Sequence, residues 1–419
     1  MKEHNKQRIK HNIRRMTTSL KWVVFSLLSG LSIGIASALF SKGLTFLTGL
    51  RVAHPFLILL LPLGGLFIVF LYRVLNEEGD TGTNLVLRTI QSGEYLPLRM
   101  APAILISTMT THFFGGSVGR EGAALQFGGS IGGALGRLFR FDEKDQHIMI
   151  MCGMSAAFSA LFGTPMAAAI FSMEVISVGI MHYSALLPCV IASLTARYTA
   201  SLMGIQKESF FVDSVPSFGP SGLGLTLLLA GICGLISILF CVLLHKSEGL
   251  LKRCIPNPWI RIVVGGAAII GLTLLVGNQT FNGAGIDVIR QSFAGPLPWY
   301  TFLLKMLFTV ITIASGYKGG EIIPTLFIGA AAGNLFAVIF GLPVGLCSAV
   351  GMCALFCGVT NCPITSLLIS FELFGFAGMP YFLVAVAISY VVSGYYGLYS
   401  SQKIVYSKYK TDFINRRTH

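Results

Sequence analysis

Charged side chains are scarce in this sequence. Asp, Glu, Lys and Arg make up 11% of its 419 residues, and only 17 residues are acidic, whereas soluble domains carry about 25% charge. Hydrophobic residues reach 54%, and apolar runs return at short intervals from Trp22 to Leu398. No soluble or disordered protein could keep so much apolar surface from water. The composition therefore indicates an integral membrane protein.

Metal-binding and catalytic patterns are lacking as well. The nine cysteines are odd in number and lie mostly in apolar runs, which favours small hydrophobic side chains in packed helices over disulfides or a metal site. A membrane-embedded enzyme would need a nucleophile with a base, or a metal cluster. His112 is the only histidine close in sequence to the acidic helix start at Glu121. We therefore expect neither an enzyme nor a bound cofactor or metal.

Basic residues gather at the two ends of the chain, whose formal net charge is +13. By the positive-inside rule, both ends face the cytoplasm and the number of crossings of the cell membrane is even. These basic ends set topology or touch anionic lipid, and we expect no nucleic acid partner. They comprise Lys2, Lys6, Arg8, Lys10, Arg14, Arg15 and Lys21, and then Lys403, Lys408, Lys410, Arg416 and Arg417.

Many of the apolar stretches fall short of the roughly 20 residues that a helix needs to cross a bilayer. Short apolar segments cut by Gly and Pro at matching places in two halves are typical of transporters built from broken helices around a mid-membrane site. The predicted stretches lie at 20–42, 55–75, 98–114, 146–162, 165–181, 183–203, 221–245, 258–277, 299–315, 325–340, 344–358, 363–375 and 379–398.

The two halves of the chain are internal duplicates. At an offset of 198 residues, seven of 22 positions are identical between 153–174 and 351–372, including a proline and a glutamate. At an offset of 201, Gly119 to Gly122 falls opposite Gly320 to Ile323. The order of the repeats alone leaves open whether they are parallel or inverted.

The duplication divides the chain into four parts. We predict a basic N-terminal tail at 1–20, a first membrane repeat at 21–203, a second at 204–399 and a short C-terminal tail at 400–419. No separate soluble regulatory domain is expected, because about 20 residues are too few to fold independently.

Four acidic residues lie within or against apolar segments of the repeats: Glu121, Glu174, Glu321 and Glu372. A charge at the bilayer centre costs roughly 2.5–3.5 kcal/mol on insertion scales, so each is a candidate for function. Glu174 and Glu372 occupy equivalent positions nine residues after a proline, which suits a structural role such as bonding the start of a neighbouring helix. Lys318 either compensates Glu321 or forms a plain surface pair.

Glu121 differs from the other acids, because its repeat partner is the apolar Ile322. It lies at a predicted helix start, where unpaired N–H groups and the positive end of the helix dipole bind anions. A carboxylate there is a tethered anion that occupies the site or leaves it when protonated. In the second repeat, Ile322 and Ile323 offer free N–H groups just before the helix that Pro324 starts.

This ordered set of motifs resembles the CLC family of anion channels and anion/proton exchangers. The resemblance implies an all-α membrane fold of two inverted repeats with partly penetrating helices, and a homodimer with one pore per subunit. It also implies that Glu121 is the gating glutamate and that Gly119, Arg120 and Gly122 belong to the anion site with it. Ile322 and Ile323 would then donate backbone N–H groups to the anion, and Tyr399 would offer its hydroxyl. The motifs are Gly119-Arg120-Glu121-Gly122, Gly320-x-x-x-Pro324 and Leu398-Tyr399-Ser400.

One further segment selects a branch of that family. Gly82-Thr83-Asn84-Leu85-Val86, by itself only a loop signal, is similar to the Gly-Asn-Asn-Leu-Ile pattern of fluoride/proton antiporters and not to the Gly-Ser-Gly-Ile-Pro of chloride members. Thr83 replaces an Asn of that branch, and Ile323 stands where it usually has Thr. Chloride exchangers carry a second glutamate where this chain has Val175.

The sequence therefore predicts export of fluoride in exchange for protons, gated by Glu121, with Thr83 and Asn84 also at the anion site. The alternative is a CLC-type chloride channel or chloride/proton exchanger.

Overall fold

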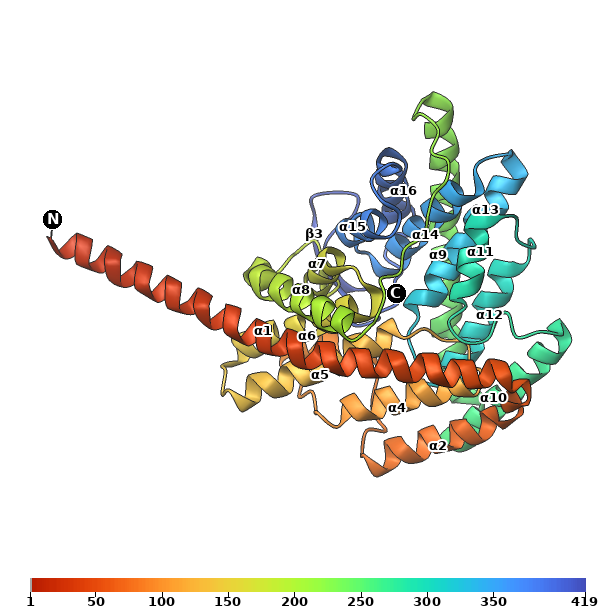
Figure 1. The fold of residues 1–419 in the computed structure, drawn as a ribbon, viewed down its shortest axis with the longest axis horizontal. Coiled ribbons are helices and arrows are strands. Elements are labelled where there is room, and N and C mark those ends of the chain that lie inside the picture. The colour runs from red at the N-terminus through yellow and green to blue at the C-terminus, as the bar shows by residue number, and fades with distance from the viewer. Residues whose placement is uncertain (1) are drawn as a thin grey trace.

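The computed structural model describes residues 2–419, with side chains from residue 16 onward. The chain forms one body of packed helices, from which the N-terminal part of α1 projects (Figure 1). The first half contains α1 (Lys2–Ala53), α2 (Leu61–Val74), α3 (Thr83–Ser92), α4 (Met100–Phe113), α5 (Glu121–Leu138), α6 (Glu143–Phe162), α7 (Pro165–Glu174) and α8 (Leu186–Leu202). The second half contains α9 (Pro220–Cys254), α10 (Pro258–Val276), α11 (Ile286–Ala294), α12 (Thr301–Ala314), α13 (Ile322–Phe340), α14 (Val344–Thr360), α15 (Pro363–Phe374) and α16 (Met379–Val392).

The helices of the two halves correspond in order and position, as the sequence duplication predicts. Residues 100 and 301 begin α4 and α12, residues 121 and 322 begin α5 and α13, and prolines 165 and 363 begin α7 and α15. The segments just before α5 and α13 pair through an antiparallel bridge between Gly119 and Gly320. Equivalent segments that meet antiparallel are what an inverted repeat requires. Figure 1 shows the two halves side by side, with α2 against α10.

Six helices in the described part of the chain are long and apolar enough to cross a membrane: α1, α2 with the 3-10 turn before it, α8 with its preceding turn, α9, α10 and α13. Four others, α3, α7, α11 and α15, have only 9 to 12 residues each. A helix of that length cannot span the roughly 30 Å hydrocarbon layer. This mixture of long and short helices confirms a multi-pass membrane protein built from broken helices.

Some predicted boundaries differ from the structure. The stretch 165–181 was expected to be one segment, but α7 ends at Glu174 and strand β1 (Ser177–Val178) follows. The stretch 379–398 contains α16 only as far as Val392. The segment from Gly82, predicted only as a loop, starts α3. Hydropathy marks apolar composition, which continues past the point where a helix ends.

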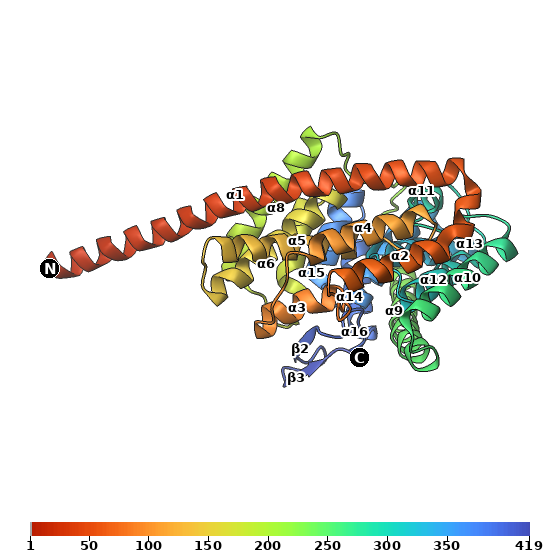
Figure 2. The ribbon, with the colours of Figure 1, turned by 90° about the horizontal axis from the view of Figure 1, so that it is seen from below.

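The last residues of the chain fold back onto the helical body. Strand β2 (Lys403–Tyr406) pairs in parallel with β1 and antiparallel with β3 (Phe413–Arg417). Figure 2 shows β2 and β3 at the lower edge of the body, beside the C-terminus. The ammonium of Lys408 donates to the carbonyl of Tyr390 at 3.0 Å and the hydroxyl of Ser393 at 3.1 Å. The hairpin is thereby fixed to the end of α16.

Glycines let two helix pairs approach closely, one pair in each repeat. A Cβ on Gly128 of α5 would lie 2.3 Å from the carbonyl oxygen of Gly153 on α6, and a Cβ on Gly329 of α13 would lie 2.5 Å from that of Gly351 on α14. Any side chain there would force the helices apart. Small residues at these positions are what close helix packing requires.

The two symmetry-related glutamates bond the helix starts of the opposite repeat. Glu174, at the end of α7, accepts the N–H groups of Ile364 at 3.1 Å and Thr365 at 2.8 Å, both in the first turn of α15. Glu372 on α15 accepts those of Met166 at 3.0 Å and Ala167 at 2.9 Å in the first turn of α7. A carboxylate in this position satisfies unpaired N–H groups and the positive end of the helix dipole. The structural role predicted for both residues is confirmed.

We expect Glu372→Ala to lower the free energy of unfolding by about 2 kcal/mol, because it leaves two buried N–H groups of α7 without an acceptor. Thermal unfolding of the purified protein in detergent measures the loss. Glu94→Ala, which removes a half-exposed partner of Arg88, is the matched control and should change stability by less than about 0.5 kcal/mol. Equal stability of Glu372→Ala and the wild type would contradict the capping role.

Candidate anion site

The starts of α5 and α13 meet backbone to backbone. The N–H of Gly119 donates to the carbonyl of Gly320 at 2.6 Å, and the N–H of Gly320 donates back to Gly119 at 2.8 Å. A Cβ on Gly122 would lie 2.7 Å from Cα of Gly320, and one on Gly320 would lie 2.4 Å from the backbone nitrogen of Gly122. Only glycine permits this approach. The bridge brings two positive helix ends together inside the protein.

The start of α3 joins the same region. The carboxylate of Asp80 accepts the N–H of Gly82 at 2.8 Å and pairs with the ammonium of Lys318 at 3.1 Å. The hydroxyl of Thr83, the first residue of α3, lies 3.5 Å from the carbonyl oxygen of Gly122. Lys318 thus forms its direct ion pair with Asp80, 238 positions away in the sequence, and its charge also acts on Glu321.

Asn84, also in the first turn of α3, has a fixed orientation. Its side-chain oxygen accepts the N–H of Ser401 at 2.9 Å. Asn84 lines the adjoining cavity, and its amide N–H2 donates no hydrogen bond to the described residues. An N–H2 group held in this way is a donor for an anion.

Tyr399 and Gln126 bring further polar atoms to this region. The hydroxyl of Tyr399 and the side-chain oxygen of Gln126 are buried and have no hydrogen-bond partner in the described part of the chain. The carboxylates of Glu321 and Glu121 both act electrostatically on Tyr399. Sequence reasoning missed Gln126, although a lone amide five residues after Glu121 in a helix of small and apolar residues was a usable signal.

A cavity of about 520 Å³ opens beside these groups. It reaches the side chains of Asn84, Gln126, Glu321 and Ser400, and charged side chains of both signs line it farther out. Ile322 and Ile323 themselves are buried, and neither side chain carries a polar atom, so their contribution is confined to their backbone N–H groups at the start of α13. The cavity gives water and small ions a route to the helix starts.

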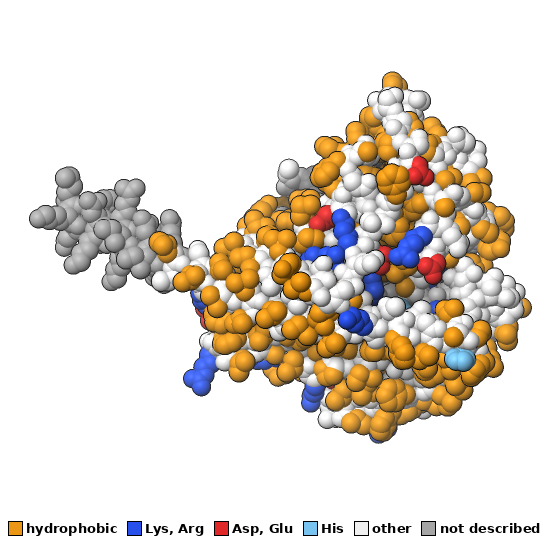
Figure 3. All heavy atoms as spheres, in the orientation of Figure 1, with side chains coloured by type: hydrophobic (Ala, Val, Ile, Leu, Met, Phe, Trp, Pro, Cys, Tyr) orange, Lys and Arg blue, Asp and Glu red, His pale blue; other side chains and the backbone are white. Residues whose placement is uncertain are grey.

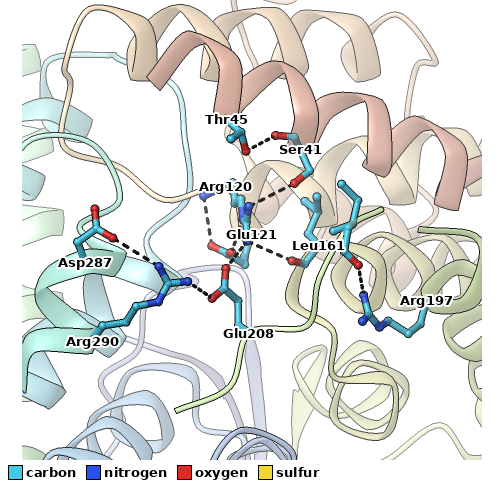
Figure 4. A network of polar contacts seen from close by, with 10 residues as sticks. Ser41, Thr45, Arg120, Glu121, Leu161, Arg197, Glu208, Asp287 and Arg290 are labelled. Atoms are coloured by element: carbon cyan, nitrogen blue, oxygen red, sulfur yellow. Dashed lines mark hydrogen bonds and ion pairs between the residues drawn. The ribbon is translucent and has the colours of Figure 1, made fainter. Parts of the chain in front are cut away.

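Glu121 is fully buried and folds back over the start of its own helix. Its carboxylate accepts the N–H of Arg120 at 3.2 Å and pairs with Nε of the same residue at 3.3 Å (Figure 4). The guanidinium of Arg120 also donates to the hydroxyl of Ser41 at 3.4 Å, the carbonyl of Leu161 at 3.2 Å and the carboxylate of Glu208 at 3.2 Å. Glu121 therefore covers the place where an anion would meet α5.

Two of the predicted site residues, Gly119 and Arg120, already have protein partners. The N–H of Gly119 is already donated to Gly320, so this donor is in use and Gly119 joins the two helix starts. Arg120 has protein partners, including two carboxylates, so an anion would compete with them. A single sequence shows which residue types are present but not which of their donors are already used.

Helix starts near the centre of the protein differ in their side-chain partners. Those of α7 and α15 are bonded by Glu372 and Glu174. Those of α3 and α13 have no side-chain cap, and α5 has the carboxylate of Glu121 alone. Buried positive helix ends without a permanent negative partner attract anions. The uncapped starts of α3 and α13 lie beside the start of α5 at the glycine bridge.

Residues 64–394 match the model of the family described as voltage gated chloride channel. The chain belongs to the CLC family. This CLC protein is 36% identical over 397 residues to a chloride/fluoride channel protein of Pseudomonas syringae pv. tomato, covering 93% of this chain and 88% of the relative. It is 24% identical over 398 residues to an H(+)/Cl(-) exchange transporter of Yersinia pestis, covering 87% and 82%.

Solved structures agree with this assignment. The CLC protein superimposes on a CLC-type fluoride/proton antiporter with a TM-score of 0.88 at 36% identity, over 91% of this chain and 98% of the other. It superimposes on a slow cyanobacterial Cl-/H+ antiporter with a TM-score of 0.78 at 20% identity, over 89% and 94%. These matches show the fold expected from the resemblance.

We expect Gly122→Ala to reduce anion transport strongly, because the new methyl group would collide with Cα of Gly320 and separate the two helix starts. Gly249→Ala is the control, since a Cβ at Gly249 of α9 meets nothing within 4 Å. Anion efflux from liposomes measures the effect, and a thermal unfolding curve shows that each variant is folded. Normal efflux by Gly122→Ala would mean that the close approach is not needed.

Proposed function

We propose that this CLC protein moves fluoride out of the cell in exchange for protons. The observation that carries the proposal is the convergence of three helix starts, α3, α5 and α13, at a buried place where the carboxylate of Glu121 folds back over the start of its own helix. Such a site binds an anion through oriented N–H groups without a full positive charge. The cavity at Asn84 and Glu321 supplies access to it.

Glu121 acts as the gate in this proposal. As a carboxylate it is held by Arg120 and by the start of its own helix. After taking up a proton it loses this attraction and leaves the site, so that an anion can take its place. When it releases the proton, the carboxylate returns and displaces the anion. One proton is thereby bound or released each time the site changes occupant.

The remaining side chains favour fluoride. Fluoride is small and tightly hydrated, so a site must replace its water with several donors. The N–H groups of Ile322 and Ile323, the amide of Asn84, the hydroxyl of Thr83 and the hydroxyl of Tyr399 are candidate donors. The amide of Asn84 is fixed by Ser401. A relative named as a chloride/fluoride channel and a solved fluoride/proton antiporter, both 36% identical to this chain, support the same substrate.

A chloride channel or exchanger of the same family is the second candidate. The specific observation in its favour is the aliphatic side chain of Ile323, which offers no hydroxyl to a strongly hydrated anion. A bare pair of helix ends would favour chloride, because its water is removed more easily.

The setting of the site is part of the proposal. We infer that both ends of the chain lie on the cytoplasmic side of the cell membrane, as the basic residues at 1–20 and 400–419 predict. Residues 21–203 and 204–399 then form the two repeats. Apolar side chains cover much of the molecular surface in Figure 3, and a homodimer would bury part of them while lipid covers the rest.

We expect the wild-type protein in liposomes to release fluoride faster than chloride. Asn84→Ala should slow fluoride efflux by about tenfold, the effect of losing one hydrogen bond to a charged ligand, and more than Tyr399→Phe does. Ion-selective electrodes measure both anions in parallel. Chloride efflux as fast as or faster than fluoride efflux would reject the fluoride proposal in favour of the chloride alternative.

Glu121→Gln should abolish proton movement driven by a fluoride gradient, because an amide of the same shape has no titrating proton. A pH-sensitive dye inside the liposomes reports the proton flux. Glu94→Gln, at a half-exposed site away from the helix starts, should leave it unchanged. Proton flux that persists in a folded Glu121→Gln protein would remove Glu121 from the proposed role.

A further inference from the structure

Glu208 lies in the segment that joins the two repeats, between α8 and α9. One oxygen of its carboxylate is 3.2 Å from the guanidinium of Arg120, and the other is 3.2 Å from that of Arg290 on α11. Figure 4 shows these side chains pointing toward one another from separate parts of the fold. The linker between the repeats is thereby tied to the residue next to Glu121.

The contacts form a row of alternating charges that leads from the interior to the surface. It runs from Glu121 through Arg120, Glu208 and Arg290 to Asp287. Exposure of the side chains rises along the row, from 0% at Glu121 and 16% at Glu208 to 58% at Arg290 and 90% at Asp287. On the face seen in Figure 3, acidic and basic side chains gather near the middle of a mainly hydrophobic surface.

Two carboxylates therefore share the single guanidinium of Arg120. The carboxylate of Glu208 therefore competes with that of Glu121 for the positive charge of Arg120. When Glu121 is neutral, Arg120 still has a negative partner and stays in place. Without Glu208, the departure of Glu121 would leave a buried guanidinium unpaired, which is costly.

We propose that Glu208 is a positioning residue for the gate: it holds Arg120 in place and its negative charge makes Glu121 take up a proton more readily. The inference rests on the gating role proposed for Glu121. It assigns a part in transport to the segment between α8 and α9, which contains none of the sequence motifs of the anion site.

Other ionisable side chains also surround Glu121 and remain unchanged in the variants below. They come from several elements around the start of α5. Arg120, Arg51 and Lys305 act on His112, whose ring lies 3.4 Å from the carbonyl oxygen of Gly119. Besides Arg120, these groups include Arg51 on α1, His112 on α4, Lys305 on α12, Glu321 at the start of α13, and Tyr399.

The test is the pH profile of fluoride efflux from liposomes. Transport needs protonated Glu121, so the rate of the wild type falls as the pH rises. Glu208→Gln removes the competing negative charge, and we expect the midpoint of this fall to move to lower pH by on the order of one unit. Glu208→Asp keeps the charge and should restore the wild-type midpoint. Asp287→Asn removes an exposed acid of the same row that does not contact Arg120 and should not move it.

A second variant should shift the midpoint of the pH profile in the opposite direction. Arg290→Gln removes the cation that partly neutralises Glu208, so the midpoint should move to higher pH. Arg290 is more than half exposed, so this variant folds even if Glu208→Gln does not. A lower thermal stability of Glu208→Gln with an unchanged midpoint would show a merely structural contact and overturn the inference.

An Arg290→Gln profile that coincides with the wild type, or one displaced to lower pH, would also overturn the inference. A wild-type protein whose fluoride efflux does not depend on pH is a different failure. It would reject the gating role of Glu121 itself and, with it, the part of Glu208.

Discussion

The structure depends on two hydrogen bonds between Gly119 and Gly320, one in each direction. They join the starts of α5 and α13, which occupy equivalent places in the two repeats. Because neither residue has a side chain, the backbones approach until their N–H groups and helix dipoles point into one small region. Everything proposed for the site follows from this contact, since a positive region inside a membrane protein must be filled by an anion or by a tethered substitute.

The buried glutamates differ in whether their carboxylate can leave the helix start that it bonds. Glu174 and Glu372 each accept two N–H groups from the opposite repeat, and their symmetry makes them a reciprocal lock between α7 and α15. Glu121 has the apolar Ile322 as its repeat partner, so no symmetric contact holds it. It bonds only to the helix start and Arg120 beside it. The same chemistry, a carboxylate at a helix start, is structural in one place and suited to gating in the other.

The repeats have also diverged around the bridge. In the first repeat, α3 places Asn84 beside the cavity. In the second, the corresponding short helix α11 carries Arg290, which binds Glu208 and through it Arg120. Helix α3 thus lines the cavity beside the helix starts. Helix α11 carries the arginine that connects Arg120, through Glu208, to the surface. An inverted repeat places such equivalent helices on different sides of the site, so each can serve a different task.

The sequence by itself determined the membrane class, the duplication, the short broken helices and the isolated position of Glu121, because hydropathy, repeat identity and the cost of a buried charge are properties of local composition. It also indicated the family through a few ordered motifs. Only the tertiary structure decided that Lys318 pairs with Asp80 and that Glu208 pairs with Arg120. It also decided that the N–H of Gly119 donates to Gly320 and that the N–H of Ser401 fixes the side chain of Asn84. These contacts join residues far apart in the chain, and the choice of hydrogen-bond partner is made by the packing of helices that no local pattern specifies.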